Sequence, residues 1–259
     1  MLGSKNQFDQ EKIVDQFMES LNGAMNQGIH VAPYHTYVDV GTHYGAYIFA
    51  AHRRGYSKIY GFEASAINTS IAHRILQQQN VSNYRIYNFA VSNESGNIVK
   101  LRKLRDIEST GQYSIIDYSL YENPKKKMGE EYENCMTISL DRIFDLCDIE
   151  HIDTMKVDIE GAEYDFLMNK DLSRIRTMYI EFHCGPTKNK ELGHYLSKYF
   201  DIYGFYTALD HNVVNSVQAG GIDVEDIDFT QEIHYMVLLN KSVPRPKVIH
   251  NHPPEEHPR

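Results

Sequence analysis

Short apolar segments and longer amphipathic segments alternate along most of the chain. The short ones are rich in β-branched and aromatic residues, whereas the longer ones repeat apolar residues every three or four positions. This alternation predicts an α/β fold of the Rossmann-like, doubly wound type, with a mostly parallel sheet and helices on both faces. The expected strands are residues 37–40, 59–62, 84–91, 97–104, 153–158, 176–183, 202–206 and 233–239.

Capping residues and glycines place the expected helices between these strands. Residues 46–54 should form a helix that Gly55 ends, and Ser65 should cap the next one. Further helices are expected in the second half of 136–147, from about Ala162, and after Thr187. The apolar face of the helix after Ser65 is expected to contain Ile67, Ile71, Ile75 and Leu76.

The pattern divides the chain into three parts. Residues 1–35 are expected to be an N-terminal helical extension, residues 36–240 the main domain, and residues 241–259 a polar, proline-rich tail. The tail contains His250, His252 and His257, which could chelate a metal ion. In the extension, the apolar residues with helical spacing are Phe8, Ile13, Phe17, Met18 and Leu21.

Residues 105–134 interrupt the main domain with a polar stretch that has no clean period. Their aromatic residues and the lysines at 125–127 predict an inserted lid or substrate loop beside the sheet, and a disordered insertion is the alternative. A second unusual stretch, 210–232, has six acidic residues and no Lys or Arg. The aromatic residues of the insertion are Tyr113, Tyr118, Tyr121 and Tyr132.

Composition restricts the function classes. The chain has 259 residues, 42% of them hydrophobic, and a formal net charge of −9, which argues against a protein that binds nucleic-acid phosphates. No apolar run approaches the roughly 18 residues of a membrane span. The first residues lack the apolar segment of a signal peptide, and the three cysteines have no metal-ligand spacing. A cytoplasmic protein is therefore expected.

The stretch 36–63 has the order strand, glycine turn, helix, strand, acidic residue. Such a unit holds ribose-bearing cofactors in α/β folds, with the turn at one end of the cofactor and the carboxylate on the ribose. The dinucleotide fingerprint needs a second glycine two residues after Gly41, and that position is His43. S-adenosylmethionine (SAM) has no phosphate and suits the spacing of Gly41 and Gly45 better. The structural alternative is a βαβ turn with Glu63 solvated.

Polar side chains also end other predicted strands. Asp158 and Glu160 follow one strand, while Glu181 and His183 lie on one face at the end of another. Parallel strands bring their carboxyl ends to one edge, where ligands of such sheets bind. We therefore expect these residues to share a crevice with Asp39 and Glu63.

Several motifs in this order resemble the FkbM-type methyltransferases, a family of class I SAM-dependent methyltransferases. The resemblance covers roughly residues 36–200, and its most specific part is the Lys-x-Asp-x-Glu-Gly-Ala-Glu run. The motifs are VDVGTHYG at 38–45, FEAS at 62–65, NFAVSNESG at 88–96, TISLDRI at 137–143, IDTMKVDIEGAEYDFL at 152–167 and YIEFH at 179–183.

This resemblance implies a seven-stranded sheet and methyl transfer from SAM to oxygen, often a sugar hydroxyl. It places the methionine end of the cofactor at the 39–45 turn, the ribose at Glu63, the adenine near residues 88–91 and the transferring methyl near Asp158. Thr42, His43 and Tyr44 replace the small residues usual in the turn, which implies a tighter pocket. The cofactor-binding residues implied are Asp39, Gly41, Thr42, His43, Gly45, Glu63, Ala64, Asn88, Ala90 and Asp158.

Methyl transfer to a hydroxyl requires alignment and removal of a proton. His183, oriented by Glu181, is the first candidate base, because imidazole titrates near neutrality. Asp158 and Glu160 are the alternatives. Asp158, Glu181 and His183 could also hold a divalent cation that lowers the hydroxyl pKa, although the sequence assigns no metal ligand. The structural alternatives are Glu160 as a helix cap, Glu163 as a first-turn residue that interacts with the helix dipole, and His183 as a hydrogen-bonded structural group.

Three functions remain open from the sequence. The first is an O-methyltransferase acting on a sugar, glycan or small metabolite. The second is an NAD-dependent oxidoreductase, which His43 and the lack of a Tyr-x-x-x-Lys pair near the sheet disfavour. The third is a non-catalytic module that binds a partner through residues 210–232. The sequence predicts no oligomeric state.

Overall fold

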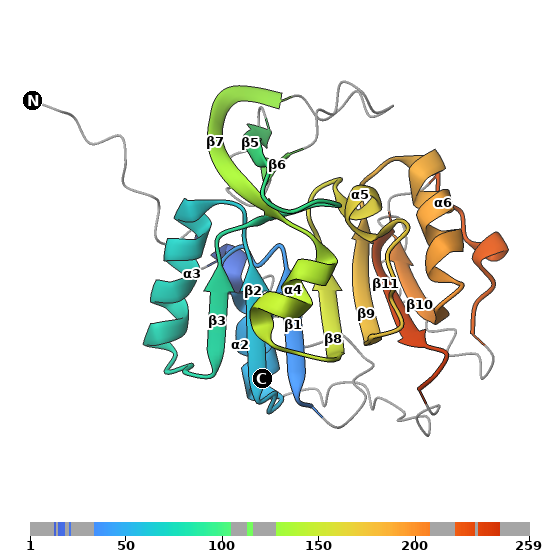
Figure 1. Cartoon of the computed structure of the whole chain (residues 1–259), viewed down its shortest axis with the longest axis horizontal. Coiled ribbons are helices and arrows are strands. Elements are labelled where there is room, and N and C mark those ends of the chain that lie inside the picture. The colour runs from blue at the N-terminus through green and yellow to red at the C-terminus, as the bar shows by residue number, and fades with distance from the viewer. Residues whose placement is uncertain are drawn as a thin grey trace, which may run out of the picture.

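The computed structural model describes residues 13, 15–18, 21, 34–104, 113–115, 128–207, 221–230 and 233–243. Its main sheet has seven strands in the order β10-β11-β9-β8-β1-β2-β3 (Figure 1). The strands are β1 (Thr36–Val40), β2 (Lys58–Phe62), β3 (Tyr84–Tyr87), β8 (Ile152–Val157), β9 (Ile175–Phe182), β10 (Phe200–Thr207) and β11 (Ile233–Asn240). The helices are α2 (Ala46–Arg53), α3 (Ala66–Gln78), α4 (Leu140–Cys147), α5 (Glu163–Leu167) and α6 (Pro186–Leu196), with a 3₁₀ turn η2 (Val224–Asp226).

Five neighbouring strands of this sheet are parallel, and β11 runs antiparallel to both β9 and β10. The predicted doubly wound, mostly parallel sheet is confirmed, with its seven strands. Because β1 lies between β2 and β8, and β9 follows β8, the four strand ends that carry the predicted polar residues are neighbours. The topology therefore brings them to one edge of the sheet.

Side-chain alternation along β1 explains the two apolar layers. Val38 and Val40 lie in the core cluster that contains α4, α5 and α6, whereas Tyr37 packs with α2 on the opposite face. Successive residues of a strand point to opposite faces, so one strand supplies both layers. Every residue of β1 is buried, as expected of a central parallel strand covered on both sides.

The helix α3 begins where its capping residue predicts. The Ser65 hydroxyl oxygen accepts a hydrogen bond from the backbone N–H of Asn68. The predicted apolar face is wrong at one position, because Ile67 is exposed and Asn68 is buried in its place. Ile71 and Leu76 are buried as expected. The first turn is therefore anchored by polar contacts near the cofactor-binding region.

The predicted strand 84–91 is divided. β3 ends at Tyr87, and a separate short strand, β4 (Ala90–Val91), pairs with the smaller sheet. Asn88 is responsible, since its side-chain amide donates to the carbonyls of Glu63 and Ala64 at 2.9 and 2.8 Å. These bonds turn the chain away from the main sheet after Tyr87.

A smaller sheet lies above the carboxyl ends of the parallel strands, at the top of Figure 1. Its order is β4-β7-β5-β6, with β5 (Ile98–Leu104), β6 (Tyr113–Ser114) and β7 (Met128–Ile138). The prediction that 105–134 is only a loop is therefore wrong for residues 113–114 and 128–134. The described parts of the insertion, 113–115 and 128–134, lie outside the main sheet, and the lysines at 125–127 are not among the described residues.

Part of the N-terminal extension is helical, at residues 13, 15–18 and 21. Ile13 and Phe17 are buried against Tyr44 and α3, whereas Met18 is exposed, contrary to its predicted place on the apolar face. Phe8 and residues 244–259 of the tail, with its three histidines, lie outside the described residues. Nowhere in the described part of the chain does a helix reach the length and apolar character needed to cross a membrane.

Candidate active site

The turn after β1 is held against the end of β8 by close backbone contact. Gly41 has φ 83°, and a Cβ atom on it would lie 1.8 Å from the carbonyl oxygen of Asp158. Its N–H donates to the Phe62 carbonyl at 2.9 Å. Only glycine permits both this conformation and this approach. The predicted role of Gly41 at the cofactor end is thus accompanied by a structural one, the junction of two strand ends.

The rest of the turn is fixed by Thr42 and Gly45. The buried Thr42 hydroxyl donates to the Asp39 carbonyl at 3.1 Å. The backbone carbonyl of Thr42 accepts from the Gly45 N–H at 2.9 Å. Gly45 has φ 86° and precedes α2 as its N-terminal cap. Its missing side chain leaves room for Leu76 of α3, which would lie 3.0 Å from a Cβ atom. The turn is therefore rigidly packed before any ligand binds.

Lys156 is the buried cation of the site. It is the last residue but one of β8 and is 2% exposed, and its ammonium donates to the Gly41 carbonyl at 2.9 Å. The same nitrogen lies 3.1 Å from Asp158 Oδ2 and 3.8 Å from Asp39 Oδ1. Although burial opposes its charge, Asp158 and Asp39 raise the pKa of Lys156 well above its ordinary value. Lys156 therefore ties β1, its turn and the end of β8 together.

The two aspartates share this cation unequally. Burial raises the pKa of Asp39 to about 7. Neither of its oxygens has a hydrogen-bond partner among the described residues, and the Lys156 ammonium lies farther from Asp39 than from Asp158. Burial also opposes ionisation of Asp158, but the nearer Lys156 and then His183 lower the pKa of Asp158 below its ordinary value. Asp158 is thus the ionised partner at neutral pH.

Glu63 lies at the end of β2, where the ribose was predicted. Its carboxylate accepts hydrogen bonds from the backbone N–H of His43 at 2.7 Å and of Ser65 at 2.9 Å. Burial nevertheless raises the pKa of Glu63 to about 7. The side chain therefore links the glycine turn to the start of α3, where the Asn68 side chain also hydrogen-bonds to it.

His43 has a strained backbone and a buried ring. It has φ 49°, and its imidazole stacks on Tyr44 with ring centroids 3.7 Å apart. Its Nε2 is buried without a hydrogen-bond partner among the described residues. Burial and then Lys156 lower the pKa of His43 to about 4, so the ring is neutral. His43 therefore fills the turn where a dinucleotide pyrophosphate would need space.

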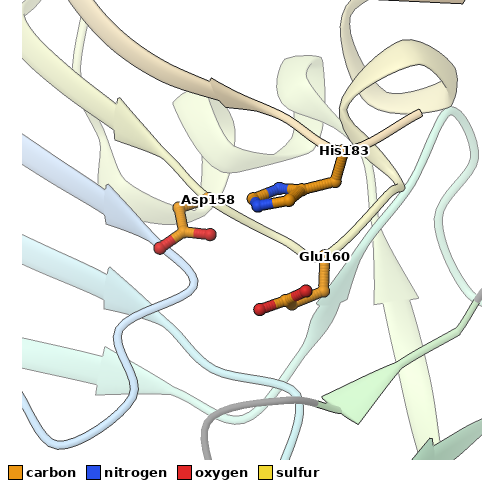
Figure 2. A group of neighbouring side chains, drawn as sticks. All are labelled: Asp158, Glu160 and His183. Atoms are coloured by element: carbon orange, nitrogen blue, oxygen red, sulfur yellow. The ribbon is translucent and has the colours of Figure 1, made fainter. Parts of the chain in front are cut away.

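Asp158, Glu160 and His183 converge from the ends of β8 and β9, as predicted. One nitrogen or oxygen atom of each lies within 4.8 Å of the others. Figure 2 shows the imidazole and the two carboxylates arranged around a common space. The Glu160 backbone has φ 51°, and its carbonyl accepts from the Ser114 hydroxyl at 2.7 Å. Strand β6 of the insertion therefore contacts this cluster.

His183 is held between two further carboxylates. Its Nδ1 lies 3.2 Å from Glu163 Oε1 and its Nε2 lies 3.3 Å from Glu181 Oε2. Burial alone would lower the pKa of the ring, but bonds to Glu163 and Glu181 raise the pKa of His183 well above its ordinary value. An imidazolium has no lone pair to accept a proton. This geometry argues against the predicted role of His183 as the neutral base.

Glu163 anchors the histidine from the first turn of α5. It is fully buried and accepts from the backbone N–H groups of Ile159 and Gly161. The Cys184 thiol also donates to Glu163, at 3.1 Å. Burial works to raise the pKa of Glu163, but the His183 bond and these donors lower it below its ordinary value. The sequence considered Glu160 as the cap of this helix, but the N-terminal cap is Ala162, with no side-chain hydrogen bond. Glu163 instead holds the loop that precedes α5.

The predicted adenine-side residues form the wall beside Glu63. Asn88 fixes the loop at Ala64, and Ala90 is buried in β4 next to it. From the smaller sheet, the Glu133 carboxylate accepts from the Ser65 hydroxyl at 2.8 Å. The insertion thus contacts the cofactor side of the site as well as the Asp158 cluster.

Sequence reasoning assigned no role to Lys156, Cys184 or Ser114 and gave Glu163 only a possible dipole role. A lysine inside an apolar central strand was an available signal, because such residues are buried only when paired. The sequence contained no comparable signal for Ser114, which reaches the site from a distant insertion.

Comparison with known proteins gives a family and a fold. Residues 39–206, more than half of the chain, match the family described as the methyltransferase FkbM domain. Curated protein sequences offer no match to the chain.

Among solved structures, the methyltransferase FkbM from Methylobacillus flagellatus KT matches with a TM-score of 0.50 at 13% sequence identity, covering 82% of this chain and 45% of that one. The present chain thus spans less than half the length of that protein. TrmK from M. capricolum, in complex with S-adenosyl-homocysteine, matches with a TM-score of 0.43 at 12% identity, covering 86% of this chain and 68% of that one. At these identities the likeness concerns the fold alone.

Proposed function

The chain belongs to the family of FkbM methyltransferase domains, and from this premise we propose that it transfers a methyl group from SAM to a hydroxyl of a sugar, glycan or small metabolite. The observation that carries the proposal is the common edge of β1, β2, β8 and β9. That edge joins a glycine turn and a buried ribose-type carboxylate to a cluster of acceptor side chains. Both halves of a transfer site are therefore adjacent.

The residues of the turn fit the SAM chemistry. Glu63 accepts from the backbone N–H groups of His43 and Ser65 and from the Asn68 side chain, and a buried carboxylate that accepts hydrogen bonds suits hydroxyl donors such as those of a ribose. Asp39 and Asp158, which both lie beside Lys156, would offer negative charge to the ammonium and the sulfonium of SAM. When bound, SAM supplies an electrophilic methyl group on a cationic sulfur. The turn, Glu63 and Asp158 would hold and align it.

The acceptor side needs a group that removes a proton. Because His183 is held as imidazolium, we assign proton acceptance to Asp158 or Glu160, which face the same space (Figure 2). Carboxylates also accept hydrogen bonds from sugar hydroxyls, which supports a hydroxylated acceptor. Alignment of acceptor oxygen, methyl and sulfur supplies the remaining catalysis.

The oxidoreductase alternative is less well supported. A dinucleotide requires its pyrophosphate to approach the glycine turn, where the buried His43 ring stacks on Tyr44. The binding-module alternative predicts cofactor binding without turnover. Titrations with S-adenosylhomocysteine (SAH) and NADH, followed by turnover assays, separate these three functions.

The decisive assay is an acceptor screen with SAM labelled in the methyl group. We expect label to enter hydroxylated glycans or metabolites as alkali-stable methyl ethers, with SAH released in equal amount. Glu63→Ala should weaken SAH binding, and the matched variant Glu94→Ala, which removes an exposed carboxylate, should not. Transfer only to nitrogen or as alkali-labile esters would contradict the proposed acceptor.

A further inference from the structure

We propose that Asp158, Glu160 and His183 form a binding site for one divalent metal ion of the Mn²⁺ type, at the carboxyl ends of β8 and β9. The ion would bind the acceptor hydroxyl beside the transferring methyl, and this catalytic use rests on the function proposed above. Metal binding itself is a property of the protein that can be measured without turnover.

The spacing of the three side chains fits a metal ion. Their candidate ligand atoms all lie within 4.8 Å of one another, and the side chains are directed into one space (Figure 2). Ligands on opposite sides of a hard cation are separated by about twice a bond of roughly 2.1–2.4 Å. A pairwise limit of 4.8 Å is therefore compatible with one ion in the middle.

The histidine is oriented as a metal ligand commonly is. Glu163 lies 3.2 Å from Nδ1 and is itself fixed by the Gly161 N–H and the Cys184 thiol. A carboxylate on one ring nitrogen sets the tautomer and directs the other nitrogen at the metal. Because a ligating imidazole must be neutral, the ion would displace the Nε2 proton of His183 on binding. On the Nε2 side, Glu181 Oε2 lies 3.3 Å away, close to the separation of about 3 Å between neighbouring ligands of one octahedral ion. Glu181 nevertheless lies outside the group of three side chains whose ligand atoms are all within 4.8 Å of one another, so it is not counted among the ligands.

The charges of the site provide a second, independent observation. Two cations, Lys156 and His183, face five carboxylates, so the cluster keeps an excess of negative charge even with both bases protonated. Asp158 gives one oxygen, Oδ2, to Lys156 and can direct the other at an ion. Buried charges are stabilised by opposite charge, which a divalent ion would supply. The five carboxylates are Asp39, Asp158, Glu160, Glu163 and Glu181.

The ligand types indicate which ion binds. Carboxylates suit Mg²⁺, Ca²⁺ and Mn²⁺, whereas an imidazole ligand favours transition metals. Mn²⁺ accepts both kinds of ligand. Bound to the ion, the acceptor hydroxyl would lose its proton more readily, and a carboxylate oxygen of Asp158 or Glu160 that does not bind the ion would accept it. Its oxygen lone pair would then form the O–CH₃ bond as the S–CH₃ bond breaks, leaving the neutral thioether of SAH.

Mn²⁺ binding to the full-length chain can be followed by electron paramagnetic resonance, because free and bound Mn²⁺ have distinct spectra. We expect one site in the wild-type protein and at least a ten-fold loss of affinity in Glu160→Gln. Asp158→Asn serves as the second variant, and thermal melting establishes that each variant is folded.

Two controls exclude other sources of binding. Glu225→Gln alters a matched histidine–carboxylate pair, since its Oε1 lies 3.5 Å from His194 Nε2 on the surface. A chain with His250, His252 and His257 replaced by alanine tests the tail. Both should bind Mn²⁺ as the wild type does.

SAH titration separates the failure of this inference from failure of the proposed function. A folded wild type that binds SAH but no Mn²⁺ would overturn the metal site and leave the function standing. Equal Mn²⁺ affinity of folded Glu160→Gln, folded Asp158→Asn and the wild type would also overturn it. Mn²⁺ binding without SAH binding would support the metal site and contradict the function.

Discussion

At the scale of single residues, Lys156 holds the site together. One ammonium group satisfies a carbonyl of the glycine turn and pairs with Asp158 and Asp39 inside the sheet. A buried charge that loses its partner is costly, so removal of the lysine would leave two uncompensated carboxylates.

Lys156→Met should therefore reduce the free energy of unfolding by roughly 3–5 kcal/mol, measured by urea denaturation at pH 7.5. The methionine keeps most of the apolar stem, so the loss reports the charge. The double variant Lys156→Met/Asp39→Asn should recover part of it, because only one carboxylate is then unpaired. A loss below about 1 kcal/mol in the single variant would contradict the central role of the ion pair.

Glu63 should make cofactor binding depend on pH. Its pKa is about 7 in the unliganded protein, and only the ionised carboxylate accepts from both ribose hydroxyls. SAH affinity measured by calorimetry should therefore increase as the pH rises from 6 to 8. Glu63→Gln should flatten this increase and cost about 1–3 kcal/mol of binding at pH 8. Glu94→Gln, which alters an exposed carboxylate, gives the control and should keep the increase.

The sequence predicted where the polar residues would meet, and the structure places Asp158, Glu160 and His183 together. It could not predict the protonation of His183, because that depends on Glu163 and Glu181, whose contacts with the ring arise only in the folded chain. An ordinary imidazole pKa was assumed, and the environment changed it.

At the scale of elements, the junction between β1 and β8 depends on one glycine. A methyl group at position 41 would overlap the Asp158 carbonyl at 1.8 Å, whereas one on Gly55, with nearly the same φ, has nothing within 4 Å. Backbone atoms cannot shift as easily as a flexible side chain.

Gly41→Ala should therefore destabilise the protein far more than Gly55→Ala. Gly55→Ala should lower the free energy of unfolding by about 1–2 kcal/mol, the cost of placing an alanine in the left-handed conformation. Gly41→Ala should lower the free energy of unfolding further, because the new methyl group also displaces the end of a strand. If this variant folds, it should bind SAH at least ten-fold more weakly than the wild type. Chemical denaturation of both variants measures the difference. Equal losses would contradict a tight junction.

The boundaries of elements were predicted well where apolar periodicity is strong, as in β1, β8 and β9. They were predicted poorly around residues 84–91 and in the insertion. In both places the structure depends on distant partners, namely the loop carbonyls that Asn88 binds and the β5 strand that pairs with β7. The local pattern of apolar and polar residues does not predict contacts with such distant partners.

The insertion contacts the site from two strands, through Ser114 to Glu160 and Glu133 to Ser65. We therefore expect hydrogen exchange in segment 105–134 to slow when SAH and an acceptor bind. Mass-spectrometric exchange of peptides from this segment would measure the change, with α4 peptides as an internal reference. Unchanged exchange in the ternary complex would contradict a substrate-binding role for the insertion.

At the scale of the whole molecule, the alternating pattern and the family motifs together predicted the fold. The doubly wound sheet follows from periodicity and right-handed crossovers, and the confirmed family adds the seven strands. The partner residues of the smaller sheet were not predictable, because polar strands at a surface have little apolar signal.

The central pairing of the sheet also determines when the site can exist. The Thr36 N–H donates to Asp153, 117 residues later in the chain, where β1 lies beside β8. Parallel strands so distant in sequence must close a long loop before their contacts are made, which slows folding. During synthesis the nascent chain therefore cannot gain stability from its ligands until β9 has left the ribosome. In refolding experiments, SAH should bind only in the slowest kinetic phase, well after helix formation.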